Sequence, residues 1–286
     1  MTFKEQSIPL RPAISQTLTM SSSFAQDLAT WPRAGCQAME VWLTKLEDHL
    51  RQTSLDETRR ILQEQQIELA AAALHGNLCF TTGEAYHTSL ADLQRRLSLC
   101  QALGIPVLII ALDEPAAVNV KTYDHARHRL CESAELASSF GVRLAVEFQG
   151  RSRWCNCLAT ALELVASCEH PCLGINLDVF HFYVGASKPE DLELLTAPLL
   201  FHVQLSDLAG DLRELASDRC RILPGEGDFR LRPIVEHLTK IGYMGYVSVE
   251  APNPHFWEMK PEQVVEAATT GLRRLLGLAS MPSRSR

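Results

Sequence analysis

Four apolar stretches of the sequence each end in a carboxylate or amide side chain. The residues are Glu147 in Leu-Ala-Val-Glu, Asp178 in Gly-Ile-Asn-Leu-Asp, Gln204 in Phe-His-Val-Gln and Glu250 in Val-Ser-Val-Glu. Because burying such a group without a partner costs several kcal/mol, each of them needs compensation. Three carboxylates brought together would also repel one another unless a cation lay among them. The pattern therefore predicts a divalent metal ion held by Glu147, Asp178, Gln204 and Glu250.

The expected ligand set offers only oxygen atoms, which suit Mn²⁺ or Mg²⁺ better than Co²⁺ or Zn²⁺. One ligand position has an alternative, because His202 and Gln204 are two residues apart and would share one face of a strand. Gln204 lies nearer the end of its stretch, so we favour it as the ligand. His202 is then a candidate to contact the substrate.

Short apolar runs alternate with longer amphipathic segments along the chain. The expected strands are Pro12–Thr17, Ala38–Leu43, Glu68–Ala73, Val107–Leu112, Arg143–Phe148, Leu173–Asp178, Leu200–Leu205 and Tyr246–Glu250. The expected helices include Asp56–Gln65, Ser89–Leu103, Tyr123–Ser139, Ala159–Ser167 and Leu231–Ile241. Glycine follows three of these helices, at Gly104, Gly141 and Gly242, where a helix C-terminus favours a left-handed residue.

The alternation of strand and helix predicts a single (β/α)8 TIM barrel over residues 1–280, with a disordered tail at 281–286. Active sites of such barrels lie at the C-terminal ends of the strands, which is where the four polar residues stand. An open, doubly wound sheet is the alternative fold. The first expected strand is not followed by the glycine-rich phosphate loop of that fold, which argues against it.

Composition and charge argue against several classes of function. Of the 286 residues, 46% are hydrophobic and 21% charged, as in globular proteins. The net charge of −7 argues against a nucleic-acid or membrane-surface partner. No stretch is apolar for long enough to span a membrane, and the first residues do not resemble a signal peptide. The 9 scattered cysteines are expected to be reduced and buried, which fits a cytoplasmic protein.

The order of the motifs resembles the xylose isomerase-like barrel superfamily, over nearly the whole chain. That group includes sugar-phosphate isomerases and epimerases, tagatose epimerases, hydroxypyruvate isomerase, inosose dehydratase, dehydroshikimate dehydratases and endonuclease IV. The motifs are Val-Glu147-Phe, Gly-Ile-Asn-Leu-Asp178-Val-Phe-His181, Phe-His202-Val-Gln204-Leu-Ser-Asp207, Pro-Gly-Glu-Gly-Asp228 and Val-Ser-Val-Glu250. The resemblance places the family's metal site on the same four residues. Many members have His where Gln204 stands, and hydroxypyruvate isomerase-like members are similar to this chain.

The resemblance implies an isomerase or epimerase that acts on a small sugar, sugar phosphate or hydroxy-keto acid. The metal would act as a Lewis acid and stabilise an enediolate formed by loss of an α-proton. Glu147 and Glu250 would then be the catalytic pair that removes and returns this proton.

Three further residues are candidates for the substrate pocket. The resemblance implies that His181 contacts a substrate oxygen, although a loop histidine bonded to backbone is the alternative. His75 ends the third apolar run and is similarly placed. Trp154 follows the fifth run and would form an apolar wall against a sugar face, or simply pack. Glu226 is expected to be a turn residue.

The sequence departs from its relatives beyond Asp207, where sugar-handling members usually place an arginine. Here the candidates are Arg213, Arg219 and Arg221, in a loop that looks longer than usual. The departure leaves the substrate open. A metal-dependent dehydratase of the inosose or 3-dehydroshikimate type is the second hypothesis, because its reaction also begins with removal of an α-proton, and a non-catalytic binding module is the third. A repair nuclease is disfavoured, because it would need more histidine ligands and basic loops. Homo-oligomers are common among such barrels, but no sequence feature selects a state.

Overall fold

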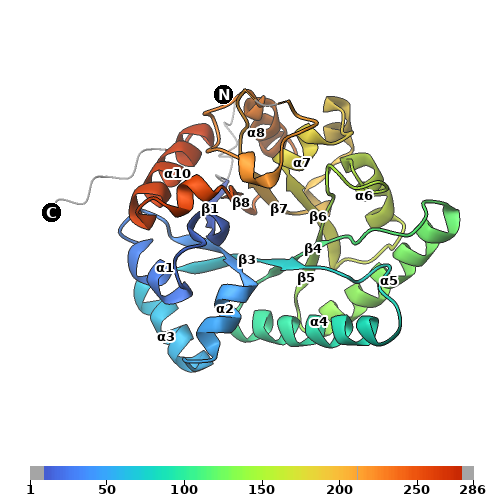
Figure 1. Ribbon diagram of the computed structural model, residues 1–286, viewed down its shortest axis with the longest axis horizontal. Helices are drawn as coiled ribbons and strands as arrows, with labels where there is room; N and C mark the ends of the chain where they lie inside the picture. Colours follow the sequence, from blue (N-terminus) through green and yellow to red (C-terminus); the bar gives the residue numbers. More distant parts are fainter. Residues whose placement is uncertain (1–9, 211, 279–286) are drawn as a thin grey trace, which may run out of the picture.

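Parallel strands pair in chain order and close into a barrel in the computed structural model, which describes residues 10–210 and 212–278. Helices surround the barrel (Figure 1). The strands are β1 Arg11–Ser15, β2 Ala38–Trp42, β3 Glu68–His75, β4 Val107–Ala111, β5 Arg143–Glu147, β6 Leu173–Asp178, β7 Leu200–Leu205 and β8 Tyr246–Val249. The predicted (β/α)8 barrel is confirmed. The predicted tail at 281–286 lies outside the described residues.

The strand bounds follow the apolar runs closely. β6 and β7 begin and end where the sequence predicts, and most other strands differ by a residue at one end. The first run was expected to extend to Thr17, but the strand ends at Ser15 because the hydroxyl of Ser15 caps a short 3-10 helix, η1 Gln16–Thr19. β3 runs two residues further than expected, to His75.

The α-helices that follow or flank the strands are α1 Phe24–Thr30, α2 Leu43–Leu50, α3 Leu55–Gln65, α4 Gly83–Leu103, α5 Val120–Ser139, α6 Leu158–Ala166, α7 Val179–Val184, α8 Leu231–Lys240, α9 Pro254–Trp257 and α10 Pro261–Leu275. Short 3-10 helices also occur at η2 Pro189–Leu194, η3 Ala197–Leu199 and η4 Asp218–Cys220. Gly104, Gly141 and Gly242 have φ values of 69°, 66° and 71° just past α4, α5 and α8. These glycines end the helices as predicted.

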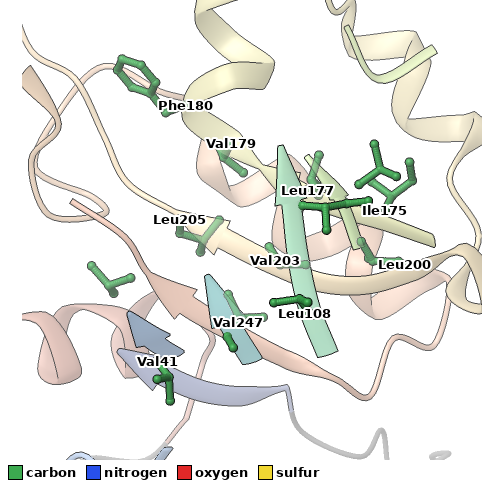
Figure 2. Packing of buried hydrophobic residues seen from close by; sticks show 14 of the residues in the cluster. Val41, Leu108, Ile175, Leu177, Val179, Phe180, Leu200, Val203, Leu205 and Val247 are labelled. Atoms are coloured by element: carbon green, nitrogen blue, oxygen red, sulfur yellow. The ribbon is translucent and has the colours of Figure 1, made fainter. Parts of the chain in front are cut away.

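The two faces of the strands pack differently. Alternate strand residues such as Leu108, Val203 and Val247 join the large apolar cluster that also holds leucines of the surrounding helices (Figure 2). A second, small cluster on the other face contains Ala71, Ala73, Val107, Ile109, Ala145 and Phe201. Buried polar side chains such as Glu147 and Gln204 lie nearer the C-terminal ends of the strands. One end of the barrel is therefore apolar, and the other is equipped for chemistry.

The structure bears on two further predictions, those for the cysteines and for membrane-spanning segments. All 9 cysteines are free, as predicted; four of them are buried, and Cys131, Cys157, Cys168, Cys172 and Cys220 are only partly buried. Among the described residues, none of the helices combines the length and apolar character needed to cross a bilayer.

Gly174 tests the packing of the apolar end. A Cβ atom there would come within 2.7 Å of the Phe201 ring and 2.8 Å of the Leu199 carbonyl oxygen. We expect Gly174→Ala to lower the free energy of unfolding by about 1–3 kcal/mol, because this part of the core cannot expand freely. Urea denaturation measures the change. Gly271→Ala in α10 is the control: the nearest atom would be 3.8 Å away, so we expect no loss, and equal losses in both variants would contradict the packing argument.

Candidate active site at the C-terminal end of the barrel

Three of the predicted ligands stand on neighbouring strands. Glu147 and Asp178 are the last residues of β5 and β6, and Gln204 is the last but one of β7. Strand register pairs Asp178 with Gln204, and it pairs Glu147 with Asn176, two residues before Asp178. Glu250 directly follows β8. All four side chains are therefore delivered to the same end of the barrel.

Asp178 is oriented by the start of a helix. Its Oδ1 accepts hydrogen bonds from the backbone N–H groups of Phe180 at 2.7 Å and His181 at 3.3 Å, so the side chain caps α7. The other oxygen, Oδ2, is left for partners outside the helix. The same short helix carries His181, whose side chain is buried next to that of Asp178.

His181 lies between two carboxylates. Its Nε2 is 3.6 Å from Glu147 Oε1 and 4.0 Å from Asp178 Oδ2. Potential ligand atoms of Glu147, Asp178 and His181 all lie within 4.8 Å of one another, and all three residues are buried. Burial alone would lower the pKa of His181, but the charge of Asp178 and the hydrogen bond and charge of Glu147 outweigh it and raise the pKa. Two carboxylates and an imidazole at these distances form a donor set that suits a divalent cation.

Gln204 is held at both ends of its carboxamide. Its Nε2 donates to Glu40 Oε1 at 2.9 Å, and its Oε1 accepts from Asn176 Nδ2. The same Asn176 nitrogen donates to Glu147 Oε2 at 2.8 Å, while Asn176 Oδ1 is buried without a partner. Asn176 thus connects Gln204 to the carboxylate cluster, and Glu40 fixes which end of the amide faces it.

His202 points to the same side of β7 as Gln204, as alternation predicts, but it has different partners. Its Nε2 lies 2.8 Å from Glu40 Oε2 and 3.0 Å from the Ser248 hydroxyl. Burial raises the pKa of Glu40, but the hydrogen bond and charge of His202, helped by Ser248 and Gln204, lower it overall. His202 therefore acts on the carboxylate that orients Gln204, and no contact links it to Glu147 or Asp178 among the described residues.

Of the three candidate arginines, Arg221 is the one that reaches the cluster. Its Nη1 donates to Asp178 Oδ2 at 2.7 Å and to Glu250 Oε2 at 2.9 Å. The guanidinium groups of Arg213 and Arg219 lie instead near aromatic rings, 5.6 Å from the ring centre of Tyr183 and 6.0 Å from that of Trp257.

Glu250 is the most perturbed carboxyl group of the site. Burial raises its pKa well above the ordinary value, and the charges of Asp178, Glu40 and Glu147 act in the same direction. Arg221 opposes this shift without cancelling it. A carboxyl group that keeps its proton at higher pH can act as a general acid.

The remaining predicted substrate residues lie apart from this cluster. His75 is turned towards α4, where its Nδ1 is 3.2 Å from Arg96 Nη1, and its Nε2 is buried without a partner. Trp154 donates through Nε1 to the Asp113 carbonyl oxygen at 3.1 Å and meets the Phe80 ring edge-on, with ring centres 5.1 Å apart. These contacts are of the packing kind that the sequence left open for Trp154.

Sequence reasoning missed Glu40 and Asn176. Both interrupt apolar strands, as the four chosen residues do, but they stand inside the strand and not at its end. The signal that could have found them is the two-residue period: Asn176 precedes Asp178 by two positions, so it shares its face. The exposed Glu226 follows Gly225, whose φ is 90°, in agreement with the expected turn.

This closed barrel, with its acidic cluster at the strand ends, defines a known class. The chain belongs to the xylose isomerase-like TIM barrel family, which matches residues 29–275. The resemblance stated from the motifs is therefore confirmed.

Particular relatives can be named. A protein of Halalkalibacterium halodurans described as inosose isomerase is 26% identical over 261 residues, covering 88% of this chain and 91% of the relative. A 3-dehydroshikimate dehydratase of Pseudomonas aeruginosa is 26% identical over 272 residues, covering 92% of this chain and 41% of the relative. Among solved structures, that of an IolI protein with a bound zinc atom has a TM-score of 0.86 at 23% identity and covers 95% of this chain and 100% of its own.

The position of His75 predicts a pH effect. Burial and the nearby charge of Arg96 lower the pKa of His75 from 6.5 to about 4. As the pH falls below 6.5, the unfolded chain takes up this proton before the folded chain does, so stability falls down to pH 4 and then levels off. The loss amounts to about 2 kcal/mol at pH 5. Denaturant unfolding of His75→Asn, which keeps an acceptor for Arg96, should show a correspondingly smaller loss than wild type. The exposed His128→Asn is the control, and identical pH profiles for His75→Asn and wild type would refute the assignment.

Proposed function

We propose that this protein is a divalent-metal-dependent isomerase or epimerase of a small polyhydroxy ketone, of the inosose type. One observation carries the proposal: Glu147, Asp178 and His181 present buried ligand atoms within 4.8 Å of one another at the end of the barrel where this family does its chemistry. The inosose isomerases among the relatives support the substrate class.

The proposed metal ligands are Glu147, Asp178, Gln204 and Glu250, with His181 as a further donor. Asp178 has one oxygen free of its helix cap, and Gln204 is oriented by Glu40 so that its oxygen faces the cluster. We propose Mn²⁺ or Mg²⁺ as the ion, since oxygen donors predominate. The imidazole and the zinc in the similar IolI structure make Zn²⁺ the ion to compare against. When bound, the cation supplies Lewis-acid stabilisation of charge that develops on a carbonyl oxygen.

The proton transfer is assigned to Glu147 and Glu250, which come from β5 and β8, with β6 and β7 between them along the sheet. Glu147 Oε1, which accepts from Gln149 Nε2 in the structure, removes the α-proton of the bound ketone, while Asn176 holds Oε2. Glu250, whose pKa is raised by burial, gives a proton to the other face of the carbon or to a neighbouring oxygen. His181 contacts a substrate oxygen through Nδ1, the buried ring nitrogen that has no partner among the described residues.

A metal-dependent dehydratase is the second candidate, because the 3-dehydroshikimate dehydratase relative aligns with 92% of this chain. Both reactions begin with removal of an α-proton, so the ligand set does not separate them. Incubation with an inosose and with 3-dehydroshikimate in D₂O, followed by NMR, does. Deuterium incorporation or isomerisation without loss of water supports the isomerase, whereas an unsaturated product that lacks one water identifies the dehydratase. The predicted cytoplasmic location and homo-oligomer stay predictions.

Glu147→Gln tests the proposed base. The amide is nearly the same size and cannot accept the proton, so we expect exchange of the substrate α-proton with solvent to fall by about 10²–10⁴. NMR in D₂O measures this rate, and circular dichroism checks that the fold is retained. Glu84→Gln, at the exposed start of α4, is the control and should exchange at the wild-type rate. Wild-type exchange in Glu147→Gln would exclude Glu147 as the base.

Gln204→Ala tests the neutral ligand. We expect at least about tenfold weaker Mn²⁺ binding with the fold intact, because one oxygen donor is lost while Glu40 keeps its bonds to His202 and Ser248. Isothermal titration calorimetry measures the affinity. Unchanged affinity would transfer the ligand role to His202, and His202→Ala would then show the larger loss.

A further inference from the structure

We propose that Arg221 is a built-in competitor of the metal ion: its guanidinium group and a divalent cation contend for the same oxygens of Asp178 and Glu250. The inference rests on the proposed metal site and adds a control on its occupancy. It concerns a residue that the metal-ligand assignment leaves out, although it is among the largest fully buried side chains of the described chain.

The Nη1 group of Arg221, which faces the carboxylates, uses both of its N–H donors there. Nη1 lies 2.7 Å from Asp178 Oδ2 and 2.9 Å from Glu250 Oε2, so one nitrogen spans two proposed ligands. Nη2 lies 3.4 Å from His181 Nε2, the imidazole nitrogen that also faces Glu147. The guanidinium therefore touches three of the side chains on which a cation would depend.

Asp178 has only one carboxylate oxygen available for both Arg221 and a cation. Its Oδ1 is committed to the backbone N–H groups that begin α7, so Oδ2 is the oxygen left to meet a cation. A Mn²⁺ or Mg²⁺ ion binds a carboxylate oxygen at about 2.0–2.2 Å. Nη1 already stands 2.7 Å from that oxygen on the side facing Glu250. A cation held by Asp178 Oδ2 together with Glu250 Oε2 would take the position between these oxygens that Nη1 occupies.

The opposite edge of the guanidinium shows where the group would remain. Nε and Nη2 donate to Asp218 Oδ1 at 3.1 and 2.6 Å, and the Asp218 side chain is 51% exposed. The guanidinium carbon lies 4.4 Å from the centre of the Phe180 ring. The backbone is fixed as well, because the Arg221 carbonyl oxygen accepts from Asn253 and the next residue, Ile222, pairs with Asp207. Displacement of Nη1 would therefore turn the whole planar guanidinium group about its contact with Asp218.

Competition can be measured as a change in metal affinity. If the ion binds only molecules in which Arg221 has left the carboxylates, the apparent dissociation constant equals the intrinsic one divided by the fraction of such molecules. Removal of the guanidinium removes this increase in the dissociation constant. We expect Arg221→Gln to bind Mn²⁺ at least about tenfold more tightly than wild type in calorimetric titration. Arg219→Gln, which removes an equal charge from the same loop, should bind within about twofold of wild type.

Arg221→Gly separates direct competition from the general effect of charge. Free guanidinium ion at millimolar concentration can enter the space left by the side chain. We expect it to raise the melting temperature of metal-free Arg221→Gly and to raise the apparent dissociation constant for Mn²⁺ in proportion to its concentration, with neither effect in wild type. If this variant folds only with guanidinium or metal, that dependence is itself the expected result. If it folds under neither, the affinity of Arg221→Gln decides.

The outcomes distinguish this inference from the proposed function. Wild type that binds Mn²⁺ while Arg221→Gln binds it no more tightly overturns the competition and leaves the function standing. A wild type and a variant that both fail to bind Mn²⁺, Mg²⁺ or Zn²⁺ overturn the metal site and the competition with it. A variant that binds metal where wild type does not supports the competition and contradicts a metal-dependent activity.

Discussion

Repulsion among buried carboxylates is the constraint around which this end of the barrel is built. Glu147, Asp178 and Glu250 are delivered to one place by three strands, and each would be costly to bury as an isolated charge. The described residues offset that cost with the guanidinium of Arg221, the imidazole of His181 and the helix cap on Asp178. What remains uncompensated is visible in Glu250, whose pKa is raised despite its bond to Arg221.

A further buried carboxylate, Glu40, orients a side chain next to the carboxylate cluster. Glu40, in the middle of β2, has no exposure and bonds to His202, Ser248 and Gln204, two of which come from β7. Because both carboxylate oxygens are engaged, Glu40 acts as a rigid acceptor that orients the Gln204 carboxamide. Glu40 is thus linked through Gln204 and Asn176 to Glu147 in the carboxylate cluster.

The fold and the position of the site follow from local patterns in the sequence. Apolar runs gave all the strands within a few residues, since a parallel barrel buries both faces of each strand, and glycine marked the helix ends. Arg221 could not be selected over Arg213 and Arg219, because a pairing of Asp207 with Ile222 inside the loop decides which arginine turns inward. His75 faces α4 because the consecutive residues Ala73 and Leu74 both pack on the second, small apolar cluster. The usual alternation of side chains between the two faces of a strand therefore fails at this point of β3.

A glutamine at position 204 makes the proposed metal site depend on the neighbouring residues that orient its carboxamide. A histidine would bring its own basic nitrogen to a cation, whereas a carboxamide is neutral and must be turned the right way round. That orientation depends on Glu40, which accepts from Nε2, and on Asn176, which holds Oε1 and Glu147 together. In the proposed site, a neutral ligand and a competing guanidinium would both favour a loosely held ion. Metal occupancy in this barrel would then be set as much by Arg221 and Glu40 as by the ligands themselves.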